Sequence, residues 1–188
     1  MNTLLAFLPG LSFPLVVWML PLFWFLHSLE EISMIDRWEM GRETEHQVIA
    51  RKSWFARWIL DAYSISRSTF ILSTVIIGTL VIGATIIGTV NLEGFGIWIY
   101  AALLGGFFLH GFVHLGETIV LRGYTPGILT GLFVVLPGSW YLYRRLFDSQ
   151  LLTMNTAVLT SLIGALIFLP ATFGIRYLFR TLMSSGTR

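Results

Sequence analysis

Two short clusters of histidine and glutamate carry most of the chemistry that this sequence could perform. Both clusters lie inside long apolar stretches of the chain. Their members are His27, Glu30 and Glu31 in the first stretch, and His110, His114 and Glu117 in the second. An ionisable side chain inside a bilayer costs several kcal/mol, so the few that occur there usually pair, bind a ligand or move protons. We therefore treat the two clusters as candidate halves of one site.

Helical spacing places each cluster on one face of a helix. At about 100° per residue, Glu30 and Glu31 fall to either side of His27. His110, His114 and Glu117 fall within a sector of about 60°. Imidazole and carboxylate groups together suit iron, zinc, manganese and similar divalent ions. Helix-borne Glu and His three residues apart also build the dinuclear sites of ferritin-like bundles.

The number of ligands leaves the number of metal ions open. The expected metal ligands are His27, Glu30, Glu31, His114 and Glu117. We expect His110 to be a sixth ligand or a catalytic base. Six groups suffice for a dinuclear centre, whereas a single ion would leave some of them for orienting the ligands or for acid–base catalysis. The richness in carboxylates favours iron, with zinc as the alternative.

The composition indicates a membrane protein. The 188 residues are 55% hydrophobic and 12% charged, whereas soluble domains have about 25% charged residues. The chain has no cysteine, which excludes disulfides, thiolate metal sites and cysteine catalysis. The net charge of +2 is small, and nothing in the sequence indicates nucleic-acid binding. One compact membrane domain accounts for the whole length.

Five stretches are apolar enough to form spans, which need about 20 residues each. They cover residues 11–35, 69–90, 95–121, 127–143 and 151–175. Helix is expected throughout, because hydrocarbon offers no hydrogen-bond partners to an open sheet edge. The sequence therefore predicts an all-α fold, an integral membrane bundle of five transmembrane helices. Pro21 predicts a kink in the first span, and Pro137-Gly138 indicates that the fourth is broken or re-entrant.

The basic residues indicate the orientation of the bundle in the membrane. Short cytoplasmic loops carry an excess of lysine and arginine. If all five stretches cross, ten of the twelve basic residues fall on one side, in the 36–67 connection, after the third span and in the C-terminal tail. Only Arg144 and Arg145 fall on the other side. We therefore expect the N-terminus outside and the C-terminus in the cytoplasm.

The 36–67 connection predicts an amphipathic helix on the cytoplasmic leaflet. Aromatic and aliphatic residues such as Trp54, Trp58 and Ile59 alternate there with basic ones, which is typical of interfacial helices. This helix is either a membrane anchor or a lid over the site. We expect His46 to be a solvated loop residue, with closure over the site as the alternative.

The two clusters have the same expected depth. Glu31 lies five residues before Asp36, and Glu117 lies five residues before Arg122. Both carboxylates are therefore about 7 Å inside the cytoplasmic boundary. The other three expected spans contain no charged residue. All ionisable groups within the spans thus belong to two helices at one level, which is the main reason to expect a shared site.

The chain resembles the bacterial HXXEE-motif family of small integral membrane proteins. Three motifs carry the resemblance in order, across about residues 20–130: His27-Ser-Leu-Glu30-Glu31, a further histidine that we take to be His114, and Tyr124-Thr-Pro126-Gly127. The resemblance implies a bacterial inner-membrane location and no established reaction. Pro126-Gly127 suits a tight turn between spans. Tyr124 is then a candidate catalytic residue at the mouth of the site, as proton donor or substrate contact.

These features favour a membrane-embedded metalloenzyme acting on a lipid-like or isoprenoid substrate from the cytoplasmic leaflet. Oxidation or hydroxylation is favoured slightly over hydrolysis. A metal-free isomerase or cyclase that uses Glu and His as acid and base is the first alternative. A non-enzymatic metal- or ligand-binding membrane protein is the second. The expected partners are the bilayer and a lipophilic small molecule, and a homo-oligomer stays open.

Overall fold

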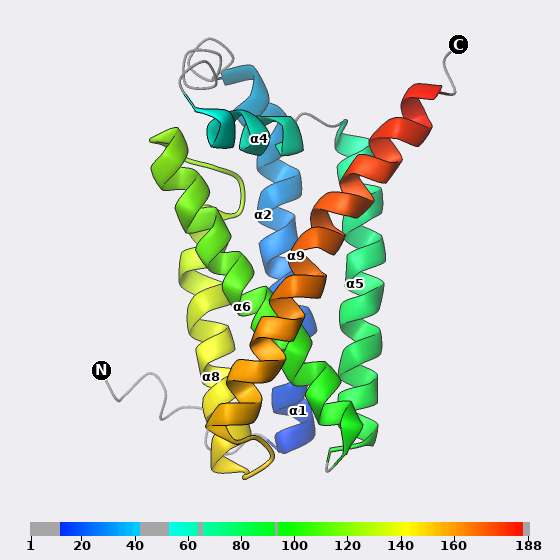
Figure 1. The fold of residues 1–188 in the computed structure, drawn as a ribbon, viewed down its shortest axis with the longest axis vertical. Helices are drawn as coiled ribbons and strands as arrows, with labels where there is room; N and C mark the ends of the chain where they lie inside the picture. Colours follow the sequence, from blue (N-terminus) through cyan, green and yellow to red (C-terminus); the bar gives the residue numbers. More distant parts are fainter. Residues whose placement is uncertain (1–11, 42–52, 64–65, 93, 186–188) are drawn as a thin grey trace.

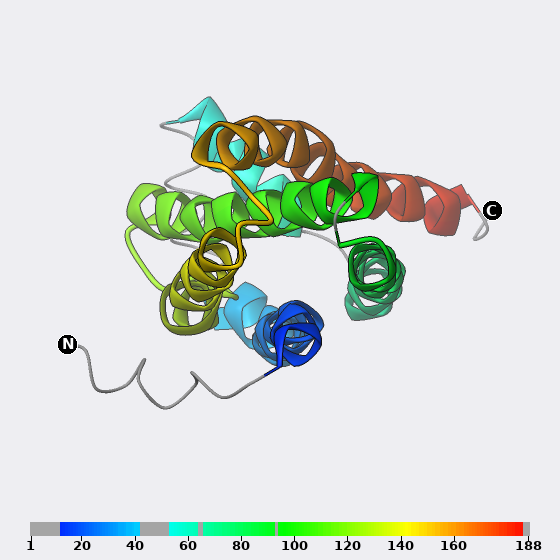
Figure 2. The ribbon, with the colours of Figure 1, turned by 90° about the horizontal axis from the view of Figure 1, so that it is seen from below.

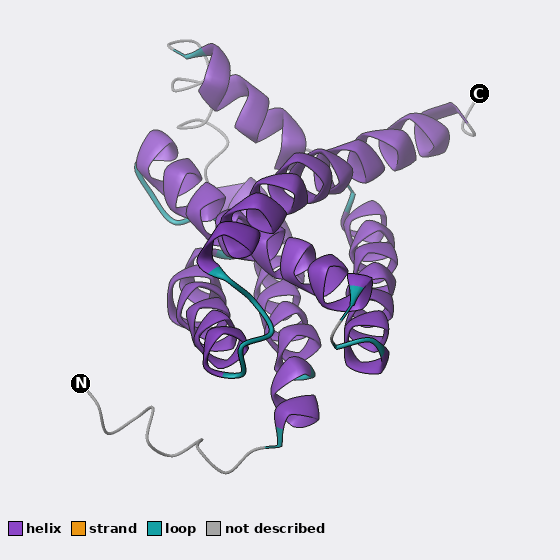
Figure 3. Ribbon diagram, turned by 60° about the horizontal axis from the view of Figure 1, so that its bottom comes forward, coloured by secondary structure: helices purple, strands orange, loops and turns teal. Residues whose placement is uncertain are grey.

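The computed structural model describes residues 12–41, 53–63, 66–92 and 94–185. Every regular element in these ranges is a helix (Figure 3), which confirms the all-α expectation there. The elements are α1 (Phe13–Val17), α2 (Met19–Gly41), α4 (Trp54–Tyr63), α5 (Arg67–Val90), α6 (Phe95–Leu121), α7 (Ile128–Thr130), the π-helical turn η2 (Gly131–Val135), α8 (Leu136–Asp148) and α9 (Met154–Ser185).

Four helices in the described ranges are long and apolar enough to cross a membrane. They are Phe13–Trp38, Arg67–Val90, Phe95–Leu121 and Met154–Thr172. These correspond to the first, second, third and fifth expected spans, and the protein is a membrane protein. The segment expected as the fourth span is helical over residues 128–148 but is divided among α7, η2 and α8. It is not one of the four.

Helix α6 lies in the middle of the bundle. Figure 2 shows α9 along one side of α6, with α8, α1–α2 and α5 on the opposite side. Helix α6 contacts α4, α5, η2, α7, α8 and α9. The close crossing of α6 and α9 depends on Gly105 and Gly164, where an added Cβ would overlap Ser161 and the Ala102 carbonyl. Small residues allow such approach in membranes.

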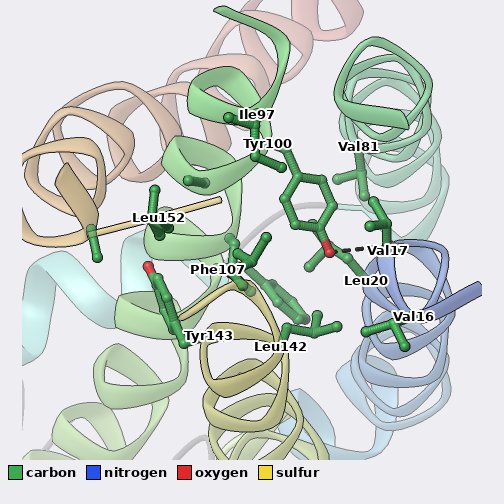
Figure 4. Packing of buried hydrophobic residues seen from close by; sticks show 14 of the residues in the cluster. Val16, Val17, Leu20, Val81, Ile97, Tyr100, Phe107, Leu142, Tyr143 and Leu152 are labelled. Atoms are coloured by element: carbon green, nitrogen blue, oxygen red, sulfur yellow. Dashed lines mark hydrogen bonds between the residues drawn. The ribbon is translucent and has the colours of Figure 1, made fainter. Parts of the chain in front are cut away.

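The first span is interrupted at Trp18, three residues before Pro21. Proline has no N–H, so the Val17 carbonyl loses the helical donor that residue 21 would supply. The Tyr100 hydroxyl donates to this carbonyl instead, at 3.1 Å. Figure 4 shows this bond among the buried side chains, with Leu20 beside it. The expected kink is therefore a short break whose exposed carbonyl is satisfied by α6.

Helix α4 lies across one end of the bundle (Figure 1) and corresponds to the expected amphipathic helix. Its N-terminus is capped by the Ser53 hydroxyl, which accepts from the Ala56 N–H. Ile59 and Tyr63 are buried on one face, whereas Trp54 is exposed on the other. Residue 46 lies outside the described residues. The buried face of α4 packs on the end of α2 and brings Tyr63 into the bundle.

Candidate metal centre

Four side chains from two helices converge in the interior of the bundle. His27 and Glu31 from α2, and His110 and His114 from α6, each offer a ligand atom, and these atoms lie within 4.8 Å of one another. All four residues are buried. His114 Nε2 lies 3.0 Å from His110 Nε2 and 3.6 Å from Glu31 Oε1. The two sequence clusters therefore form one group.

These separations suit a single bound ion. Two nitrogen ligands at 2.0–2.1 Å from a tetrahedral zinc ion are about 3.3 Å apart. The distances of 3.0 and 3.6 Å from His114 Nε2 to its two neighbours lie on either side of this value. Three imidazoles and one carboxylate also form a donor set that zinc, iron or manganese accepts. All four ligand atoms lie within 4.8 Å of one another, so the residues fit one divalent cation around which they draw closer together.

The imidazole of His27 is oriented by a chain of two hydrogen bonds. The Thr130 hydroxyl donates its only hydrogen to Glu30 Oε2. Its oxygen, 2.9 Å from His27 Nδ1, must then accept the Nδ1 proton. The lone pair of His27 consequently lies on Nε2. Such outer hydrogen bonds fix the tautomer and orientation of metal-binding histidines.

His114 is held in the same way by a glutamate of its own helix. Glu117 Oε2 lies 3.2 Å from His114 Nδ1, and a carboxylate oxygen accepts, so the imidazole proton belongs on Nδ1. The Tyr63 hydroxyl, which comes from α4, donates to the same Glu117 oxygen at 2.7 Å. His114 Nε2 therefore faces the group with its lone pair, like His27 Nε2.

Glu30 also caps a helix that begins inside the bundle. Its carboxylate accepts from the backbone N–H groups of Leu129 and Thr130, at 3.2 and 2.6 Å. The first N–H groups of a helix have no partner within it, and leaving them unbonded in hydrocarbon costs several kcal/mol each. A negative charge at this end of the helix is also favourable. Glu30 thus allows the 128–148 segment to begin at the depth of the histidines.

The loop between α6 and α7 closes one side of the group. Figure 1 shows it turning back into the bundle from the end of α6. The Trp38 indole donates to the Tyr124 carbonyl at 2.7 Å, and the Thr118 and Thr125 hydroxyls lie 2.7 Å apart. Gly127 then lies against both rings, since a Cβ added there would be 2.8 Å from His114 Cε1 and 2.9 Å from His27 Cε1.

Gly127 is also required by the backbone. Its φ of 91° is in the left-handed region, which glycine adopts far more readily than other residues. The three sequence motifs therefore meet in space, with the Tyr-Thr-Pro-Gly loop packed on the histidines of the other two.

Comparison with known proteins agrees with this convergence. A family described as a protein of unknown function with HXXEE motif matches residues 18–142. The chain belongs to this family. The uncharacterized protein YrkK of Bacillus subtilis (strain 168) is 30% identical over 73 residues, which are 38% of this chain and 46% of that protein. The aligned region thus spans about half of the relative's length. No solved structure matches the chain.

The HXXEE motif has two faces in this structure, and its two glutamates differ in role. Glu31 joins the histidines, whereas Glu30 contacts the start of α7 and the Tyr124 hydroxyl, at 2.8 Å from its Oε1. Tyr124, expected as a catalytic residue, thus contacts Glu30. Burial and the neighbouring Glu30 carboxylate raise the pKa of the Tyr124 phenol, so it remains a hydrogen-bond donor.

Glu117, also expected as a ligand, lies beside His114 but outside the group of four. Metal binding by any of these residues stays a prediction.

Sequence reasoning missed two residues that touch the group. Thr130 follows the Tyr-Thr-Pro-Gly loop by three positions, and an isolated threonine in an apolar span gives no signal. Tyr63 is four residues after Ile59, on the buried face of α4. That spacing could have placed Tyr63 toward the bundle, because residues four apart share a helix face. Nothing in the sequence indicates what it meets there.

Proposed function

We propose that this protein is an intramembrane metalloenzyme in which His27, Glu31, His110 and His114 hold one divalent cation beside a lipophilic substrate. One observation carries the proposal: four buried ligand atoms from two helices lie within 4.8 Å of one another. The bonds from His27 and His114 Nδ1 support it, because they leave both Nε2 atoms able to bind metal. Iron is the favoured ion and zinc the alternative. We further propose that α4 faces the cytoplasm, from the distribution of basic residues.

The contacts of Glu30 and Glu117 favour one ion over two. Glu30 accepts hydrogen bonds from Tyr124, Leu129 and Thr130, and Glu117 accepts from Tyr63. A dinuclear centre would need these carboxylates as bridging or terminal ligands, and their present partners would then lose their acceptors. Their role in the proposal is to orient His27 and His114.

The depth of the group favours a lipophilic substrate. His114 and His110 lie eight and twelve residues before Arg122, which is about 12 and 18 Å along α6. The hydrocarbon layer is about 30 Å thick, so these two histidines are near its middle. The rings of Phe107 and Phe168 pack at 5.9 Å from those of His27 and His110, respectively, and give the group apolar neighbours. A molecule that reaches this place does so through an apolar medium.

A bound divalent cation would supply a Lewis acid, and iron would also supply redox chemistry. Oxidation is favoured over hydrolysis, because lipid-like molecules present carbon chains at this depth. Hydroxylation of a chain carbon consumes dioxygen, two electrons from a reductant and two protons, and it releases water. Within the chain, Glu117 Oε2 lies 3.2 Å from His114 Nδ1 and accepts its proton, and the Tyr63 hydroxyl donates to the same Glu117 oxygen.

Metal analysis of the protein purified without chelators tests the proposal. We expect one ion per chain in the wild type and none in the His114→Ala and Glu31→Gln variants. Asp36→Asn is the matched control, since it changes a carboxylate of the same helix that pairs with Arg67 at 3.3 Å, and it should keep the ion. A metal-free wild type, or equal metal loss in Glu31→Gln and Asp36→Asn, would refute the proposal.

A metal-free isomerase or cyclase is the second candidate. Hydrogen-bonding groups run without a gap from Tyr63 through Glu117 and His114 to His110. The two Nε2 atoms at 3.0 Å share one proton when no cation lies between them. Such a chain could deliver a proton to one carbon and remove it from another. Turnover of a lipophilic substrate that survives complete metal removal would favour this candidate.

A further inference from the structure

An apolar cavity of about 770 Å³ lies between α5, α6 and α9. Its lining includes Leu80, Gly83, Trp98, Leu159 and Phe168. Leu80, Trp98 and Leu159 are each more than half exposed, so the cavity opens toward the lipid. Its volume is in the range of ligand pockets, about 300–1,000 Å³. It is separate from the histidine group but is joined to it through one residue.

That residue is Phe168, which lines the cavity and also touches the candidate centre. Its ring lies 5.9 Å from the His110 ring, edge to face. Its Cβ is packed close to Gly106, where an added Cβ would lie 2.7 Å away. Phe168 is 7% exposed. A molecule that fills the cavity therefore ends against a side chain in contact with a candidate metal ligand.

The threonine hydroxyls of the lining are already used. Thr79, Thr160 and Thr172 donate their hydroxyl hydrogens to carbonyls of their own helices, at 2.9, 2.8 and 2.7 Å. The Thr156 hydroxyl lies 2.9 Å from that of Thr153. Apart from the Trp98 indole N–H, the rest of the lining is apolar or glycine. A polar head group would find few partners there and would lose its hydration on burial. A hydrocarbon chain has no hydrogen bonds with water to lose when it enters the cavity.

The cavity lies in the half of the bundle away from α4. Its walls are residues 95–103 at the start of α6, 77–87 toward the end of α5, and 156–172 in the first part of α9. These parts lie toward the end of the bundle opposite α4 in Figure 1. A chain lying in the cavity would therefore extend from that end of the bundle toward the middle of the membrane.

We propose that this cavity binds the hydrocarbon chain of the substrate, with the chain end against Phe168 and next to His110. The proposal rests on the proposed function. It specifies a lipid-like molecule with one long alkyl or isoprenoid chain that reacts at a carbon of the chain. The head group stays at the membrane surface opposite α4, because moving it to the histidines would strip its hydration. Access is thus from the leaflet opposite α4, not from the cytoplasmic leaflet expected from the sequence.

Photolabelling tests the proposal. The wild type is reconstituted in phosphatidylcholine vesicles with increasing amounts of a long-chain fatty acid that carries a diazirine at its chain end. A second probe carries the diazirine beside the carboxyl group. After illumination, mass spectrometry maps the labelled peptides, and the metal content of the same samples is measured.

Two variants narrow the cavity and one serves as a control. Gly83→Leu adds a side chain where a Cβ meets nothing within 4 Å, so it fills the cavity without a clash. Ala84→Phe fills the same wall and keeps the test valid if the first variant fails to fold. Gly174→Leu is the matched control, since a Cβ there also meets nothing within 4 Å and Gly174 is not part of the lining.

We expect saturable labelling around Phe168 by the chain-end probe, and around Phe95 by the carboxyl-side probe. Labelling should be lost in Gly83→Leu and Ala84→Phe and kept in Gly174→Leu, with unchanged metal content. Labelling that rises linearly with probe, as bulk lipid gives, or that is equal in all variants, would overturn the proposal. Absence of metal from every sample would refute the proposed function alone. The labelling would still show whether the cavity binds a hydrocarbon chain.

Discussion

Replacing Gly127 by alanine should damage the candidate centre without touching any of its ligands. The new Cβ would lie 2.8 Å from His114 Cε1 and 2.9 Å from His27 Cε1. Carbon atoms in contact are normally about 3.5–4.0 Å apart, so each ring must retreat by about 0.6–1.2 Å. A displacement of this size exceeds the tolerance of about 0.5 Å within which a preorganised site works.

The expected cost has two parts. A non-glycine residue in the left-handed region costs about 1–2 kcal/mol, and forcing an extra methyl into a filled space costs about 1–3 kcal/mol. We therefore expect Gly127→Ala to lower the free energy of unfolding by about 2–5 kcal/mol. Removal of a group that orients a metal ligand typically lowers metal affinity by about 10–100-fold. We expect Gly127→Ala to lower metal affinity by at least that factor.

Gly131→Ala is the matched control, four residues further along. A Cβ there would meet its nearest atoms, His114 Cβ and the Gly111 carbonyl oxygen, at ordinary distances of 3.7 and 3.8 Å. Alanine in a helix is favoured over glycine by about 1 kcal/mol, so this variant should be slightly more stable. Thermal unfolding in detergent gives the stabilities, and chelator competition gives the metal affinities. Equal metal affinity in the two alanine variants would refute the reasoning.

Three further predictions follow from single hydrogen bonds. Tyr63→Phe removes the donor to Glu117 and should weaken metal binding by about 10–100-fold with the fold retained; chelator competition showing wild-type affinity would contradict this. Thr130→Val removes the hydroxyl shared by His27 and Glu30 and should destabilise the protein by about 1–3 kcal/mol. Thermal unfolding measures this cost against Thr89→Val, whose hydroxyl donates to a carbonyl of its own helix. Tyr100→Phe should lower the free energy of unfolding by about 1–3 kcal/mol. The loss should be smaller in a Pro21→Ala background, where residue 21 regains an N–H for the Val17 carbonyl. Additive losses in this double-mutant cycle would show that the Tyr100 bond does not replace the missing helical bond.

The sequence determined the class of fold and the location of the chemistry. Apolar runs of sufficient length predict membrane helices, because hydrocarbon leaves the backbone no other way to satisfy its hydrogen bonds. Charges are so unfavourable in that medium that the few present, such as Glu31 and Glu117, stand out without any structure. Helical spacing then shows that His110 and His114 share a face. Equal depth predicts that α2 and α6 meet, and their ligand atoms lie within 4.8 Å of one another in the structure.

Only the tertiary structure decided which atoms face one another. Glu30 and Glu31 are adjacent in the sequence but point about 100° apart on the helix, and the rotation of α2 about its axis sends one to α7 and the other to the histidines. Thr130 and Tyr63 are ordinary residues until neighbouring helices bring them beside Glu30 and Glu117. That rotation is set by close contacts between distant residues, such as Gly138 against the Phe23 ring. Periodicity orients a side chain relative to its own helix, whereas packing between helices selects its partner.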